Sequence, residues 1–142
     1  MTADHDAYFE EVEARFANAH DLDLGLEEEF QILDAETHEL TPGFEPLRDT
    51  APARLRERIA GELLTSEIEV ATPRTLHFGQ AAKQLLLNRA ELFAHADAQG
   101  YALGSTGTHP FSGWKDQQII DTPHYRLVED RLKYVAWRNN TW

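Results

Sequence analysis

The sequence predicts an α+β fold in which helices flank an antiparallel sheet. Two stretches alternate between apolar and polar residues with the period of two that is typical of half-buried strands. The segments around them repeat apolar residues at the three- and four-residue spacing of an amphipathic helix. The chain has 142 residues, of which 42% are apolar, and this suits one domain with a hydrophobic core.

These patterns predict an ordered series of elements. In chain order they are a helix over residues 6–19, a strand over 22–32, a polar turn over 34–38, a short strand over 39–41, a helix over 51–62, a strand over 63–72, a helix over 75–99, a strand over 101–108 and a helix that opens at Thr122. The 75–99 helix is the longest, and Gly100 is placed to end it. At the last helix Thr122 is expected as the N-cap and Pro123 as the first helical residue.

Each of the two major strands has one apolar face. In the 22–32 strand the even positions are apolar except Glu28, which would need a partner such as arginine on the buried side. In the 63–72 strand Leu64, Ile68 and Val70 share one face. In the 75–99 helix the residues expected to face the core are Phe78, Ala82, Leu85, Leu86, Leu92, Phe93 and Ala96.

The composition excludes several classes of function. The formal net charge is -12, from 25 acidic and 13 basic residues, and such a field repels nucleic acid and anionic membranes. The chain has no cysteine, which excludes disulfides, thiolate zinc sites and cysteine nucleophiles. The N-terminus has no apolar signal region, and no apolar run approaches the ~20 residues that span a bilayer. We therefore expect a soluble, cytoplasmic protein with neither nucleic acid nor a membrane as partner.

Both strands present carboxylate pairs opposite their apolar faces. Glu27 and Glu29 are two positions apart and therefore share a face, and the same holds for Glu67 and Glu69. If the strands are neighbours, up to four negative charges converge and require a cation. Oxygen ligands without cysteine favour Mg²⁺ or Mn²⁺ over zinc. The alternative is that these side chains form a solvated outer face.

Three motifs together resemble the glutamate–cysteine ligase 2 family of carboxylate–amine ligases. They are Leu-Gly-Leu-Glu-Glu-Glu-Phe at 24–30, Ser-Glu-Ile-Glu-Val-Ala-Thr-Pro at 66–73 and Gly-Thr-His-Pro-Phe at 107–111, in the family's order and separation. The resemblance implies a glutamine-synthetase-like fold, in which an antiparallel sheet forms a funnel that holds metal ions, ATP and an acidic substrate. It also implies that ATP phosphorylates a glutamate-like carboxylate and that an amine such as that of cysteine then attacks, which gives a γ-glutamyl amide.

The resemblance also assigns site residues. It implies that Glu27, Glu29 and Glu69 are metal ligands, with Glu67 as a further candidate for the same cluster. They would neutralise charge on the transferred phosphoryl group through the metal.

The predicted substrate contacts lie outside these strands. Thr108 and His109, in the loop at 107–111, are candidates for substrate binding. Arg74 and Arg126 are candidates for binding a carboxylate or phosphate. The alternatives are a tight turn held by structural hydrogen bonds for the loop, and ordinary surface positions for the arginines.

The resemblance covers only the first part of the family's length. Family members continue into a strand with a His-Val-His motif that helps to complete the metal and nucleotide site. We therefore expect residues 1–142 to be the N-terminal portion of a truncated catalytic domain that is inactive alone. An unpaired sheet edge, with Leu64, Ile68 and Val70 half covered, would favour homo-oligomers or association with the missing C-terminal half. The alternatives are a binding module that retains part of the metal site and a metal-dependent hydrolase.

Overall fold

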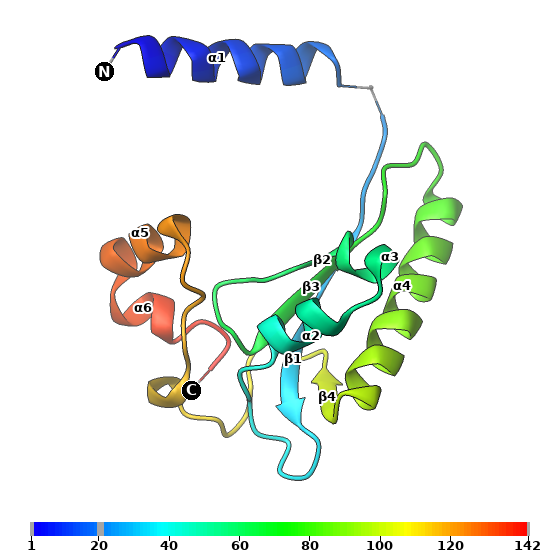
Figure 1. The fold of residues 1–142 in the computed structure, drawn as a ribbon, viewed down its shortest axis with the longest axis vertical. Helices are drawn as coiled ribbons and strands as arrows, with labels where there is room; N and C mark the ends of the chain where they lie inside the picture. Colours follow the sequence, from blue (N-terminus) through cyan, green and yellow to red (C-terminus); the bar gives the residue numbers. More distant parts are fainter. Residues whose placement is uncertain (1, 20–21, 142) are drawn as a thin grey trace.

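The computed structural model describes residues 2–19 and 22–141 (Figure 1). The helices are α1 (Thr2–Ala17), α2 (Phe44–Thr50), α3 (Ala53–Arg56), α4 (Phe78–Ala98), α5 (Pro123–Leu132) and α6 (Tyr134–Trp137), with a 3₁₀ turn, η1, at Trp114–Asp116. The strands are β1 (Glu27–Asp34), β2 (Ile59–Ala60), β3 (Glu67–Ala71) and β4 (Tyr101–Gly104). None of the helices in the described ranges combines the length and the hydrophobicity needed to cross a membrane.

The four strands form one antiparallel sheet in the order β2-β3-β1-β4. Helices α2, α3 and α4 cover one side of the sheet, and α5 and α6 lie beside it, away from α4 (Figure 1). The main core joins the apolar face of β1 and β3 to these helices; its buried residues include Phe30, Ile32, Ile68, Val70, Leu47, Leu55, Leu92 and Ala96. The prediction of an α+β fold with an antiparallel sheet and flanking helices is therefore confirmed.

The apolar face of β3 is more completely covered than the sequence suggested. Leu64, Ile68 and Val70 are each 0% exposed, so the expectation that they would be half covered is wrong. Ile68 and Val70 belong to the main core, whereas Leu64 packs in a second cluster with Leu63 and Ala136. The helices present in the chain are sufficient to bury this face.

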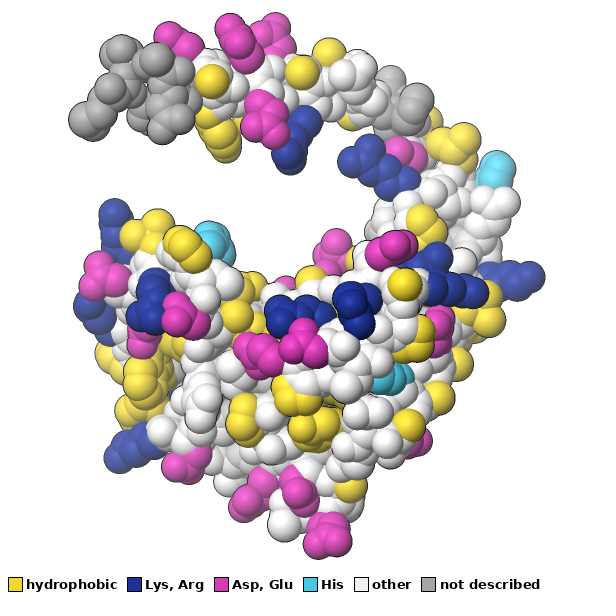
Figure 2. Space-filling view, in the orientation of Figure 1, with side chains coloured by type: hydrophobic (Ala, Val, Ile, Leu, Met, Phe, Trp, Pro, Cys, Tyr) yellow, Lys and Arg dark blue, Asp and Glu magenta, His cyan; other side chains and the backbone are white. Residues whose placement is uncertain are grey.

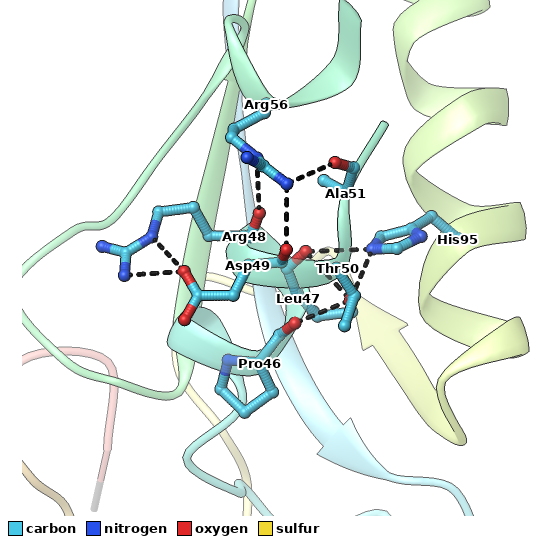
Figure 3. A network of polar contacts seen from close by, with 8 residues as sticks. All are labelled: Pro46, Leu47, Arg48, Asp49, Thr50, Ala51, Arg56 and His95. Carbon is cyan, nitrogen blue, oxygen red and sulfur yellow. Dashed lines mark hydrogen bonds and ion pairs between the residues drawn. The ribbon is translucent and has the colours of Figure 1, made fainter. Parts of the chain in front are cut away.

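A polar network joins α2, α3 and α4 (Figure 3). The Arg56 guanidinium donates hydrogen bonds to the carbonyl oxygens of Arg48 (3.1 Å), Asp49 (2.9 Å) and Ala51 (3.0 Å). The carbonyls at the end of a helix have no partner inside it, so Arg56 stabilises the end of α2. His95 of α4 contacts the same helix end through the carbonyl oxygen of Leu47 at 2.9 Å.

Several element boundaries differ from the prediction. The first strand begins at Glu27 and not at Leu22. Leu22 is 92% exposed and has a left-handed φ of 66°, which is incompatible with a strand at that position. The helix predicted over 51–62 is also wrong, since α3 ends at Arg56 and Ile59–Ala60 is a strand. Pairing of this segment with β3 overrides its helical spacing, which a local pattern does not reveal.

The ends of α4 and α5 follow the sequence signals. Gly100 has a φ of +82° directly after the C-cap of α4, as predicted. The Thr122 hydroxyl accepts a hydrogen bond from the N–H of Tyr125 at 3.1 Å and caps α5. By contrast, Phe78 and Leu86 of α4, both predicted to face the core, are 69% and 63% exposed. Helix α4 contacts the sheet along the narrower stripe of Ala81, Asn88, Leu92 and Ala96.

Helix α1 stands apart from the rest of the molecule (Figures 1 and 2). All residues from 6 to 19 are exposed, including Tyr8, Phe9, Val12 and Phe16. The amphipathic pattern therefore predicts the helix, but its apolar face does not contact the core.

Candidate functional site

The register of β1 and β3 places the glutamates on one face of the sheet. Glu29 lies directly opposite Glu69, Gln31 lies opposite Glu67, and Glu27 lies opposite Ala71. Residues opposite each other in an antiparallel pair project to the same side, as do residues two apart in one strand. The four glutamates therefore share the face that does not pack against α4. This placement agrees with the strand parity read from the sequence.

A fifth carboxyl group, that of Glu62, joins this acidic face. Ala60 of β2 lies opposite Glu69, and Glu62 follows β2 by two residues. Its carboxyl group raises the pKa of Glu69, and its negative charge also raises the pKa of Glu67. Sequence reasoning missed Glu62 because it assigned residues 51–62 to a helix. We define the acidic face by the five residues Glu27, Glu29, Glu62, Glu67 and Glu69.

Burial and repulsion make two of these carboxyl groups hard to ionise. Burial raises the pKa of Glu67 to about 8, and the charges of Glu29 and Glu62 act in the same direction, against a hydrogen bond from the N–H of Leu64. Burial also raises the pKa of Glu69 to about 7, helped by the neighbouring carboxyl groups of Glu62, Glu27 and Glu29. At neutral pH the acidic face therefore retains protons in place of a cation.

The donor chemistry of the acidic face suits a hard divalent cation. All of its side-chain ligands are carboxylate oxygens, which Mg²⁺ and Mn²⁺ prefer. Within residues 2–19 and 22–141, however, no three His, Asp or Glu side chains are arranged to hold a metal ion. The residue types fit a divalent cation, and their present positions would have to change for three of them to bind it.

The C-terminal segment places an amide between two of the carboxylates. The side-chain nitrogen of Asn140 donates hydrogen bonds to Glu29, at 3.1 Å, and to Glu67. The backbone carbonyl oxygen of Asn140 accepts hydrogen bonds from the N–H of His109 at 2.8 Å and from the side-chain amide of Gln31 at 3.4 Å. Asn140 has a φ of +59°, a left-handed conformation that asparagine tolerates better than most residues. No pattern in the sequence singled out this residue.

A small cavity of about 170 Å³ connects the acidic face to the loop after β4. It is lined by Glu29, Phe30, Gln31, Ser105, Thr106, Gly107 and Asn140. The Thr106 hydroxyl donates to the side-chain oxygen of Gln31 at 2.7 Å, so the loop is tied to β1 at this point. The predicted Gly107 loop thus lies beside the acidic face.

Within this loop, His109 has a structural role. Its side chain is 3% exposed, and its Nε2 lies 2.9 Å from the carbonyl oxygen of His38, to which it donates. Its Nδ1 accepts from the N–H of Ser112 at 3.0 Å. Both ring nitrogens contact the backbone, so His109 holds the loop in place, and its contact with a substrate stays a prediction. Thr108, next to it, is exposed and does not line the cavity.

The two candidate arginines lie elsewhere on the surface. Arg74 is exposed, follows the last residue of β3 by three positions and lies 4.0 Å from Asp23. Thr108, by contrast, follows β4, whose last residue, Gly104, pairs with Gln31 in the middle of β1, whereas Ala71 pairs with Glu27 at its start. The structure therefore does not bring Arg74 together with the loop.

Arg126 forms an ion pair with Asp121 at 2.5 Å. It lines a groove of about 520 Å³ together with Trp114, Glu129, Asp130, Lys133, Tyr134 and Trp137. None of the five glutamates of the acidic face lines this groove, so the structure separates Arg126 from them.

The partner predicted for Glu28 is present on the opposite face of the sheet. Arg89 of α4 forms a two-pronged contact with the Glu28 carboxylate, and one of its bonds is 3.0 Å long. The Glu28 side chain is 16% exposed, so this pairing compensates a largely buried charge. Glu28 therefore joins β1 to α4 on the face of the sheet opposite the acidic face.

Comparison with known proteins identifies similar sequences. Residues 23–142 match the model of the glutamate–cysteine ligase family 2 (GCS2). "Putative glutamate–cysteine ligase 2-2" of Rubrobacter xylanophilus is 39% identical over 119 residues, which cover 84% of this chain and 30% of the relative. "Putative glutamate–cysteine ligase 2" of Sorangium cellulosum is 41% identical over 118 residues, 82% of this chain and 32% of the relative. The glutamate–cysteine ligase of Natronomonas pharaonis is 34% identical over 124 residues, with 83% and 33% covered. The chain thus spans about a third of the length of these relatives.

Proposed function

The chain belongs to glutamate–cysteine ligase family 2, and from this we propose that it is the N-terminal portion of an ATP-dependent carboxylate–amine ligase. In the proposed reaction ATP phosphorylates the side-chain carboxylate of a glutamate-like substrate, and an amine such as that of cysteine displaces the phosphate. The product is a γ-glutamyl amide. The sheet would be one part of a larger, glutamine-synthetase-like sheet.

The observation that supports this proposal is the acidic face. Five carboxyl groups gather on one side of three adjacent strands, and two of them have pKa values raised to about 8 and about 7. A surface that served only to meet water would not bury Glu67 to 1% exposure. A buried carboxyl group within a cluster of exposed and partly exposed ones instead suits a site that binds a cation.

Each member of the site has a proposed role. Glu27, Glu29 and Glu69 would hold Mg²⁺ or Mn²⁺, with Glu67 beside them. When bound, the metal would neutralise the charge that develops on the transferred phosphoryl group. Deprotonation of Glu67 and Glu69 must accompany binding, because only carboxylates are effective ligands.

Substrate binding is proposed for the loop that follows β4. Its exposed Thr108 would contact the substrate, while the buried His109 holds the loop through its contacts with His38 and Ser112. Arg74 and Arg126 remain candidates for a carboxylate or phosphate in a larger assembly. In the described residues neither arginine lies near the acidic face, so this role would require further polypeptide to complete a binding site around each of them.

Association with further polypeptide is part of the proposal. Strands β2 and β4 are the edges of the sheet, and β2 has only two residues. A second surface that could associate is formed by exposed apolar side chains of α5 and α6, namely Leu127, Leu132, Tyr134 and Val135. Such surfaces favour self-association or docking of the polypeptide that would complete the catalytic domain.

A binding module without turnover is the second candidate. It is favoured by the finding that no three potential ligands in the described residues converge on one ion position. The ligase requires a complete set of metal ligands and phosphoryl transfer, whereas the module retains only part of the metal site and requires neither.

The proposal can be tested by metal binding and by ADP release. We expect the 142-residue chain to bind Mn²⁺ in calorimetry, Glu27→Gln to weaken binding at least about tenfold, and the exposed control Glu57→Gln to bind like the wild type. Equal binding by wild type and Glu27→Gln would refute the metal assignment. With glutamate, cysteine and Mg²⁺-ATP, no ADP release is expected from the chain alone. Turnover by a stable monomer would show that the site is complete within these residues.

A further inference from the structure

Asn140 lies between Glu29 and Glu67, two of the candidate metal ligands. A side-chain amide has two N–H donors, and those of Asn140 point to one carboxyl group each. In the described chain, no lysine, arginine or histidine forms an ion pair with either glutamate. Among the described residues, the Asn140 amide is the only side-chain donor with hydrogen bonds to both glutamates.

We propose that the Asn140 amide holds the place of a divalent cation in the metal-free protein and is displaced when the metal binds. The reasoning is one of competition, because the carboxylate oxygens that accept from Asn140 are the same oxygens that a metal would coordinate. An amide supplies only partial positive charge, so it stabilises the pair less than a cation does. This inference rests on the proposed function, since it assumes that the acidic face takes Mg²⁺ or Mn²⁺.

Displacement of Asn140 would be transmitted to the loop after β4. The carbonyl oxygen of the same residue accepts from the N–H of His109 at 2.8 Å, and His109 holds the loop through His38 and Ser112. The side chain of Asn140 therefore contacts the acidic face while its backbone contacts the loop. Metal binding and the position of the candidate substrate loop become coupled through one residue.

The sign of a mutational effect distinguishes this model from a simple positioning role. Asn140→Gly removes the competing amide and keeps the left-handed backbone without strain, because glycine adopts positive φ freely. If the amide competes with the metal, Mn²⁺ affinity should rise at least about tenfold, because the loss of even one of its two hydrogen bonds to a charged group corresponds to about that factor. Asn140→Asp should bind Mn²⁺ more tightly still, since it adds a carboxylate ligand. The matched control is Asn139→Gly, at the exposed neighbouring position, which should leave the affinity unchanged.

A measurement on the wild-type chain adds a readout of the coupling. In a titration with diamagnetic Mg²⁺, the NMR signals of the Asn140 side-chain amide and of the His109 backbone N–H should shift together. Circular dichroism of each variant verifies that it is folded before its affinity is interpreted.

The possible failures are distinguishable. If Mn²⁺ binds to the wild type but Asn140→Gly binds it more weakly or equally, Asn140 orients the carboxylates and the displacement model is overturned. If Mg²⁺ binds without shifting the Asn140 and His109 signals, the coupling is overturned. If neither wild type nor any variant binds a divalent cation, the metal assignment in the proposed function fails, and this inference fails with it.

Discussion

Replacing Glu67 with glutamine is expected to stabilise the fold at alkaline pH and to change it little in acid. Glu67 is 1% exposed, and its carboxyl group accepts a hydrogen bond from the N–H of Leu64 at 3.2 Å. Burial first, and then the charges of Glu29 and Glu62, raise its pKa to about 8. Glutamine has nearly the same shape, can accept the same hydrogen bond and does not ionise.

The size of the effect follows from proton linkage. The pKa in the folded protein, about 8, lies above the ordinary value of 4.5, so the folded state holds the proton more tightly than the unfolded state. The stability that this proton provides is complete below pH 4.5 and is lost as the pH rises through 8. At about 1.4 kcal/mol per pH unit the full loss is about 5 kcal/mol, an upper bound because neighbouring groups relax. We expect Glu67→Gln to raise the free energy of unfolding by ~2 kcal/mol or more at pH 9.

The assay is urea unfolding between pH 5 and pH 9, with a chelator present and tryptophan fluorescence as the probe. The difference between Glu67→Gln and wild type should be small at pH 5, grow between about pH 5 and pH 8 and level off above pH 8. The control Glu57→Gln changes an exposed carboxylate by the same chemistry and should show no such growth. A Glu67→Gln difference that is constant across the pH range would refute the idea that Glu67 is a buried acid with a raised pKa.

Three further substitutions test the fold around the site by the same unfolding measurement. Arg89→Met should destabilise by about 1–3 kcal/mol because it leaves the largely buried Glu28 carboxylate unpaired; adding Glu28→Gln should recover part of the loss, and no recovery would contradict the pairing. Leu92→Ala should cost about 2–5 kcal/mol, since Leu92 is 0% exposed in the main core, and a cost under 1 kcal/mol would contradict that packing. Thr122→Ala should cost about 1 kcal/mol by removing the cap of α5, whereas Thr122→Ser should retain most of the stability.

Local sequence patterns were sufficient for the features that depend on neighbouring residues. The period-two alternation predicted that Glu27 and Glu29 share a face, because side-chain direction in a strand follows from backbone geometry alone. The cap at Thr122 and the left-handed Gly100 depend on local hydrogen bonding and steric freedom, and both are confirmed. The pairing of Glu28 with an arginine could be anticipated because a charge on a buried face needs a partner, although the sequence did not identify Arg89.

Features set by contacts between distant segments were predicted poorly. Residues 51–62 have helical spacing, yet Ile59–Ala60 forms a strand because β3 offers an edge with which to pair. This pairing brings Glu62 to the acidic face. The burial of His109 against the backbone of His38 is a further contact between distant segments that no local pattern reveals.

The sequence by itself determined the family, the α+β class and the shared face of the four glutamates, since motifs and periodicity are local properties of the chain. Only the tertiary structure decided which groups surround those glutamates. It places Glu62 beside Glu69, and it brings Asn140 across 111 residues of sequence to Glu29. The physical reason is that pKa values and cation sites depend on distances through space and on burial, and both arise only when separate segments pack together.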